Sequence, residues 1–129
     1  MPHVTLEYST NLEEAIDVGG LCERLRQAAA AIDEIAMPGV RVRAYRADHH
    51  AIADGADGHG FVDISVRLRG GRSGAVKDKV AKLLFAAARE CIDPYMSGNS
   101  LALSLEVRDI DPELSPKTGT IRDHLRGIP

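Results

Sequence analysis

Hydrophobic periodicity constrains the fold of this chain most, because it switches twice from a strand-like period of two to a helical spacing and back. Apolar and polar residues alternate in four segments, residues 2–9, 39–47, 61–69 and 101–109. Apolar residues recur at helical spacing in two segments that lie between them, residues 18–34 and 76–91. The predicted order is therefore strand, helix, strand, and then the same again.

Each half reads as a βαβ unit, whose two strands are parallel and whose helix covers one face. The sequence predicts an α+β fold, with one four-stranded sheet and both helices on the same face. We expect a single domain over residues 1–129, with a rough internal repeat of about 1–58 and 59–129. Thr120 and Asp123, at capping-box spacing, predict a short helix near the end.

The sheet face away from the helices would carry charged and small residues, among them Glu7, Arg41, Asp63 and Glu106. Such a face can simply meet water, or it can form a wet contact between identical subunits. The pattern alone is compatible with both.

Composition excludes several classes of function. A formal net charge of −3 and an aromatic content of 4% give no support to nucleic-acid binding. No apolar run is long enough to span a membrane and no signal peptide is present, so we expect a cytoplasmic protein. Cys22 and Cys91 lack metal-ligand spacing, and their places in helical patterns predict buried free thiols.

Arginine is unusually frequent, since it makes up 12 of the 16 basic residues, and six of these lie between Arg41 and Arg72. A guanidinium binds a carboxylate through two parallel hydrogen bonds, so the cluster indicates a local anion site. The alternative is that these arginines pair with Asp63, Glu7 and Glu106 across strands or between subunits. Arg72 favours the anion site most, because it precedes Ser73, a good cap for the second helix.

The segment ADHHAIADGADGHG, residues 47–60, is rich in histidine and aspartate. It matches no calcium-loop pattern, and its two Asp-Gly pairs are typical of turns. We expect a polar hairpin loop between two strands and assign no metal.

Pro2 is an unusual first residue for a strand, because it has no backbone N–H to donate. Initiator methionine is normally removed before a small residue, and its removal would leave a secondary amine at the strand end. An α-amino group has a pKa of about 7.7–8.0, and burial or a nearby guanidinium lowers it. Pro2 could therefore serve as a general base, or it could merely protect the terminus.

Pro2 and the segments GVRVR, ADG, FVDISVRLRGGRS and LALSLEV resemble 5-carboxymethyl-2-hydroxymuconate isomerase, of the tautomerase superfamily. The likeness runs in order over nearly the whole chain. It implies a tautomerase-like domain of two βαβ units that assembles as a homotrimer. The polar sheet faces of the three subunits would then meet around the threefold axis.

The resemblance also implies a site and a reaction. Pro2 would be the catalytic base, Arg41 and Arg72 would hold the carboxylates of the substrate, and Arg43 is a further substrate-binding candidate. The reaction would be a cofactor-independent isomerisation of 5-carboxymethyl-2-hydroxymuconate or a similar dicarboxylic enol from homoprotocatechuate degradation. The alternatives are a non-catalytic module that binds a small anion, and a tautomerase-superfamily enzyme for a different unsaturated acid.

Overall fold

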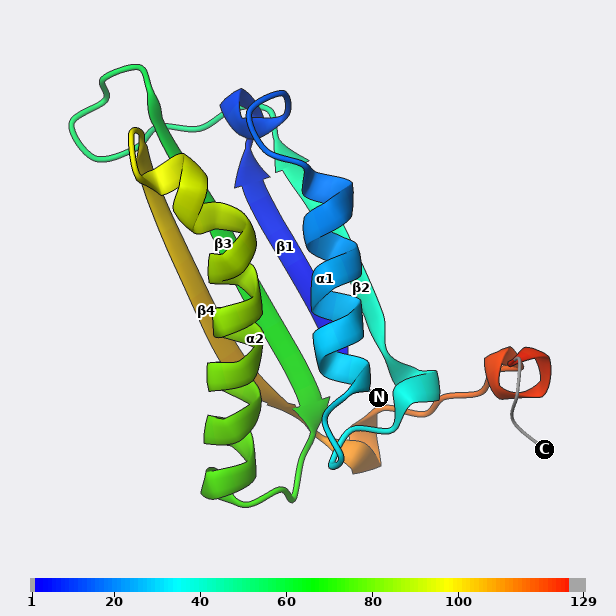
Figure 1. The fold of residues 1–129 in the computed structure, drawn as a ribbon. Coiled ribbons are helices and arrows are strands. Elements are labelled where there is room, and N and C mark those ends of the chain that lie inside the picture. The colour runs from blue at the N-terminus through cyan, green and yellow to red at the C-terminus, as the bar shows by residue number, and fades with distance from the viewer. Residues whose placement is uncertain (1, 126–129) are drawn as a thin grey trace.

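The computed structural model describes residues 2–125 and has one sheet with two helices on one face (Figure 1). The strands are β1 (His3–Ser9), β2 (Arg41–Ala47), β3 (His59–Arg69) and β4 (Ser100–Ile110). The α-helices are α1 (Val18–Ala30) and α2 (Gly74–Met96). The described part of the chain also contains four short 3₁₀ helices: η1 (Thr10–Leu12), η2 (Met37–Gly39), η3 (Pro112–Leu114) and η4 (Ile121–His124).

The strand order is β2-β1-β3-β4, with β1 parallel to β2, β3 parallel to β4, and β1 antiparallel to β3. The α+β fold and the two parallel pairs predicted from periodicity are confirmed. The order corrects one expectation: β1 lies between β2 and β3, so residues 48–58 cross the end of β1 and form no hairpin.

The core lies between the sheet and the two helices. The sheet contributes the buried alternating side chains of β1 and β3, such as Leu6, Ile64 and Leu68. The helices contribute Leu21 and Leu25 from α1 and a stripe along α2, which consists of Val80, Leu84, Ala87, Ala88 and Ile92. The apolar residues of the edge strand β4 are only half-buried.

Helix ends follow the capping chemistry of the sequence. Ser73 caps α2, since its hydroxyl accepts a hydrogen bond from the N–H of Val76 (3.2 Å). Asp17 caps α1 in the same way, accepting from the N–H of Gly20 (2.9 Å). The expected final helix is the 3₁₀ turn η4, and Thr120 makes no side-chain cap there.

The expectation of two buried thiols was wrong for Cys91 and only partly met by Cys22. Both thiols are free, but Cys91 is exposed and Cys22 is half-buried. Among residues 2–125, no helix is both long and apolar enough to cross a bilayer.

Candidate functional site

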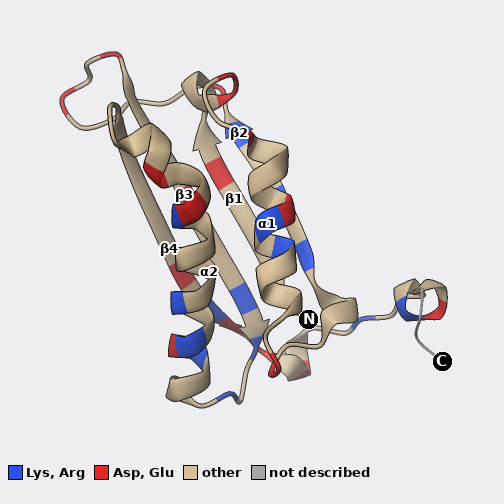
Figure 2. Ribbon diagram, in the orientation of Figure 1, with Lys and Arg blue, Asp and Glu red and all other residues tan. Residues whose placement is uncertain are grey.

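The antiparallel arrangement of the two halves brings distant segments to one end of the sheet. The first residues of β1 and β2 lie beside the last residues of β3, because His3 pairs with both Arg41 and Arg67. Figure 2 shows Lys and Arg along β2, on the lower half of β3 and on the tail. The first residues of β1 therefore lie close to a group of basic residues at this end of the sheet.

Pro2 lies buried immediately before β1. Its carbonyl accepts a hydrogen bond from the N–H of Arg41 (3.1 Å), which continues the β1–β2 pairing by one step. Because Pro2 takes part in this pairing only through its carbonyl, the missing N–H of proline removes no hydrogen bond between β1 and β2. The expected removal of Met1 concerns a residue outside the described range.

Three guanidinium groups surround His3 on the polar face of the sheet. Residues paired across strands share a face, so Arg41 and Arg67 lie on either side of His3. Arg43, two residues further along β2, places Nη1 3.2 Å from Nδ1 of His3. Since a guanidinium can only donate, Nδ1 accepts and the neutral ring carries its proton on Nε2.

Burial lowers the pKa of His3, and the positive charges of Arg67, Arg43 and Arg41 lower it further. The imidazole is therefore neutral near pH 7, and the net charge around it comes from the arginines. The same positive charges that disfavour protonation of His3 favour the binding of an anion beside it.

Arg72 is oriented by the turn between β3 and α2. Gly71 has a φ of 100°, in the left-handed region that favours glycine, and this turn leads directly into the Ser73 cap. The Arg72 guanidinium donates from Nη1 to the carbonyl of Arg69 (2.8 Å) and from Nη2 to the carbonyl of Glu34 (3.2 Å). Carbonyls fix its direction without neutralising its charge.

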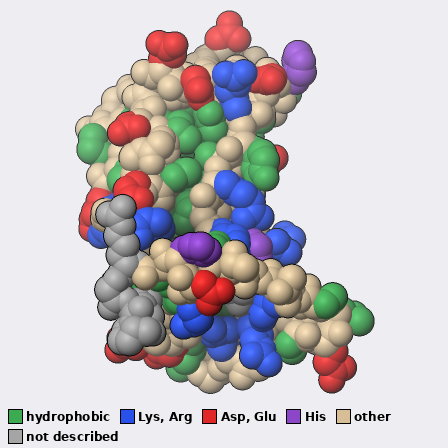
Figure 3. Space-filling model, turned by 90° about the vertical axis from the view of Figure 1, so that its right-hand side faces the viewer, with side chains coloured by type: hydrophobic (Ala, Val, Ile, Leu, Met, Phe, Trp, Pro, Cys, Tyr) green, Lys and Arg blue, Asp and Glu red, His purple; other side chains and the backbone are tan. Residues whose placement is uncertain are grey.

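A cavity of about 380 Å³, here called the basic hollow, lies between this turn, η2 and the tail. Its charged lining residues are all cations, Arg69, Arg72, Lys117 and Arg122. Figure 3, which looks onto β2 and the tail, shows Lys and Arg gathered over the lower half of this side, whereas Asp and Glu are spread from the top to the bottom. The hollow is thus suited to an anion.

Gly39 connects the basic hollow with the arginines around His3. It lines the hollow, and its carbonyl accepts from Nη1 of Arg41 (2.9 Å). The structure thus brings Pro2, Arg41 and Arg43 to one end of the sheet and places Arg72 in the adjacent hollow.

Sequence reasoning missed His3, Arg67, Arg69, Lys117 and Arg122 as members of this region. Alternation already put Arg67 on the same face as Arg41 and could have indicated it. The tail residues carried no such signal, because their position depends on how the segment after β4 folds back.

The histidine-rich segment forms a separate surface. His59 contacts Asp54 through Nε2 (2.8 Å) and Ser100 through Nδ1 (2.7 Å), and so fastens the crossing loop to the start of β4. Within residues 2–125, no three His, Cys, Asp or Glu side chains are grouped to hold a metal ion.

Comparison with known proteins identifies relatives over the full length. A family model described as 5-carboxymethyl-2-hydroxymuconate isomerase matches residues 2–125. The 5-carboxymethyl-2-hydroxymuconate Delta-isomerase of Escherichia coli is 28% identical over 121 residues, 94% of this chain and 96% of that protein.

Solved structures agree with the sequence match. A crystal structure of a 5-carboxymethyl-2-hydroxymuconate delta-isomerase has a TM-score of 0.88 at 29% identity and covers 100% of this chain and 96% of its own. The corresponding protein from Deinococcus radiodurans R1 has a TM-score of 0.87 at 30% identity, with 95% and 92% covered. A fused 4-OT protein, a symmetric trimer, shares the fold at a TM-score of 0.58 and 19% identity, over 90% of this chain and 93% of its own.

Proposed function

Because this chain belongs to the 5-carboxymethyl-2-hydroxymuconate isomerase family and is an isomerase of that family, we propose that it converts 5-carboxymethyl-2-hydroxymuconate, or a similar enol, into its keto isomer with Pro2 as the base. The observation that supports this most is the meeting of Pro2 with a group of arginines at one end of the sheet.

Pro2 supplies the proton transfer in this proposal. Its amine becomes basic once Met1 is removed, since an amide nitrogen cannot accept a proton. Burial and the neighbouring guanidinium groups would disfavour the ammonium form of that amine and so favour the neutral base. The amine takes the proton of the substrate hydroxyl and returns a proton to a carbon, so atoms and charge balance within one molecule.

The arginines hold the substrate and stabilise its charge. Arg72 binds a carboxylate in the basic hollow, while Arg41 and Arg43 bind a second carboxylate or the oxygen at C2. As the hydroxyl loses its proton, negative charge builds on that oxygen, and fixed guanidinium donors stabilise it.

We also propose that the protein forms a homotrimer. The edge strand β4 leaves the side chains of Leu101, Leu103 and Leu105 only half-covered, and the fused 4-OT neighbour is a symmetric trimer. Such an assembly would place the polar sheet faces against one another. Native mass spectrometry should give three times the subunit mass, and a monomer under dilute conditions would contradict the proposal.

Replacement of Pro2 by alanine tests the mechanism. Alanine keeps an α-amine after Met1 is removed but loses the fixed direction of the proline ring, so we expect kcat to fall, by at most the roughly 10²–10⁴-fold that a general base usually contributes, in an ultraviolet assay with 5-carboxymethyl-2-hydroxymuconate. The intact mass of each preparation must first show that Met1 is absent. A variant that folds normally, lacks Met1 and keeps full turnover would show that the proline ring is not needed, and full turnover by wild-type protein that retains Met1 would exclude the Pro2 amine as the base.

A panel of unsaturated acids identifies the substrate. If another enol acid gives a higher kcat/KM than 5-carboxymethyl-2-hydroxymuconate, and Pro2→Ala abolishes that activity, the mechanism holds with a different substrate.

A further inference from the structure

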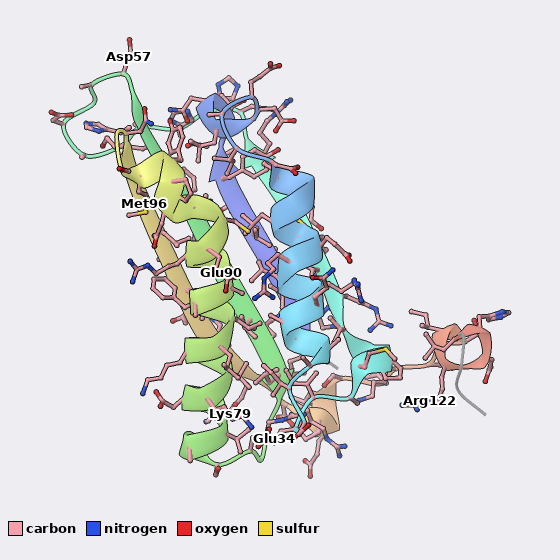
Figure 4. The ribbon with its side chains drawn as sticks, in the orientation of Figure 1. Glu34, Asp57, Lys79, Glu90, Met96 and Arg122 are labelled. Carbon is pink, nitrogen blue, oxygen red and sulfur yellow. The ribbon has the colours of Figure 1, made fainter. Side chains whose placement is uncertain are left out.

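The basic hollow contains more positive charge than one carboxylate needs. Arg69 and Arg72 come from the turn after β3, whereas Lys117 and Arg122 come from the tail that follows β4 (Figure 4 labels Arg122). Two separate parts of the chain thus deliver cations to the same cavity.

Within residues 2–125, none of these four cations forms an ion pair with a carboxylate. Between residues 2 and 125, the ion pairs formed within 4 Å involve cations elsewhere, such as Arg24, Lys79 and Arg89. Glu34, whose carbonyl holds Arg72, directs its carboxylate to Lys79 (2.9 Å), and both lie together at the base of the helices in Figure 4. Uncompensated cations around one cavity repel one another, and a bound polyanion removes that repulsion.

We propose that Lys117 and Arg122, together with Arg69, form a second carboxylate subsite beside Arg72 and select substrates with an additional carboxylate arm. This inference rests on the proposed function, in which Arg72 holds a first carboxylate. A muconate has two carboxylates, and the 5-carboxymethyl group that names the relatives' substrate adds a third. The cavity of about 380 Å³ is within the usual range for small-ligand sites.

The tail is the part that can be altered without disturbing the fold. Lys117 and Arg122 are exposed and belong to no strand or α-helix. Replacing both with glutamine removes two charges and leaves Pro2, Arg41 and Arg72 in place. The matched control is the double variant Lys82→Gln, Arg89→Gln, which removes two exposed charges from α2.

Activity on two dienols provides the first test. We expect the ratio of kcat/KM for 5-carboxymethyl-2-hydroxymuconate to that for 2-hydroxymuconate, which lacks the third carboxylate, to fall about fivefold per tail cation removed. The effect should weaken at high salt, because exposed charges are screened. The control variant should keep the wild-type ratio. An unchanged ratio in the tail variant, or equal losses for both substrates, would overturn the proposal.

A binding measurement separates this proposal from the catalytic one. Titration calorimetry should show that the tail variant binds tricarballylate, an unreactive tricarboxylate, about 25-fold more weakly than wild type, while its affinity for glutarate changes little. If neither dienol is converted but this difference is found, the proposed reaction fails and the subsite stands. Equal tricarballylate affinity in wild type and tail variant would exclude the subsite.

Discussion

Replacement of Arg72 by alanine tests the site most directly. Of its five N–H donors, one on Nη1 binds the carbonyl of Arg69 and one on Nη2 binds the carbonyl of Glu34. Three donors remain for a ligand, which is enough for a two-pronged contact with a carboxylate. The substitution therefore removes one fixed cation and its donors from the basic hollow.

The size of the effect follows from these contacts. A hydrogen bond to a charged group contributes about 1.5–3 kcal/mol, which corresponds to a loss of about 10–150-fold in kcat/KM. The two carbonyls that lose their donor lie at the surface, where water can replace it, so the free energy of unfolding should fall by about 1 kcal/mol or less.

Initial rates at low substrate concentration give kcat/KM, and urea titration gives the free energy of unfolding. Arg72→Lys should recover only part of the loss, because an ammonium cannot hold two carbonyls and present a fork to the ligand at once. Arg89→Ala, which removes an exposed cation of α2, serves as the control. A kcat/KM for Arg72→Ala within about twofold of wild type would remove Arg72 from the site.

Two further predictions concern stability. A methyl group added at Gly60 would lie 2.9 Å from Cδ2 of the fully buried Leu12. Gly60→Ala should therefore lower the free energy of unfolding, measured by urea titration, by about 1–3 kcal/mol, and by less when Leu12 is also replaced by alanine. An equal loss with and without Leu12→Ala would contradict the predicted clash. The pKa of His3 is lowered in the folded state, so as the pH decreases below about 6.5 the unfolded chain takes up a proton at His3 before the folded chain does. The free energy of unfolding should therefore fall as the pH decreases from about 6.5 toward the pKa of His3 in the folded state. His3→Asn should flatten this pH dependence in urea titrations between pH 5 and 7.5, and an unchanged slope would show that another group is responsible.

Strands and helices were largely predictable, because burial imposes the periodicity from which they were inferred. The helix ends differ: α1 was expected to reach residue 34 and ends at Ala30, whereas α2 was expected to end near residue 91 and continues to Met96. Ile32 and Ile35 continue the apolar spacing and are buried, but they do so from the turns after the helix. Periodicity reports which side chains face the core, and a packed turn can satisfy it as well as a helix.

Strand order was not available from the sequence. The Asp-Gly turns of residues 47–60 have hairpin chemistry, yet β1 occupies the position between the strands they connect. The residue preferences of a turn do not indicate whether the two strands that it connects are neighbours or are separated by a third strand.

The site was predictable in part, for a related reason. Arg41, Arg43 and Arg72 stand out in the sequence, whereas Lys117 and Arg122 join the hollow only through the path of the tail. Within the chain, two of the acidic residues proposed as partners of these arginines make other contacts. Asp63 accepts a hydrogen bond from Ser104, and Glu106 binds Arg108 of its own strand.

The central position of β1 has a consequence for biosynthesis. Of the four strands, β1 is synthesised before the others, yet it is bonded on both sides in the finished sheet, to β2 and to β3. The buried face that holds Val4 and Leu6 therefore stays incomplete until the chain has been made as far as Arg69. Pairing over such sequence distances is slow and leaves apolar strand surface open to other nascent chains. The arrangement that brings Pro2 beside the arginines thus also makes β1 the strand whose apolar side chains wait longest for their partners during synthesis.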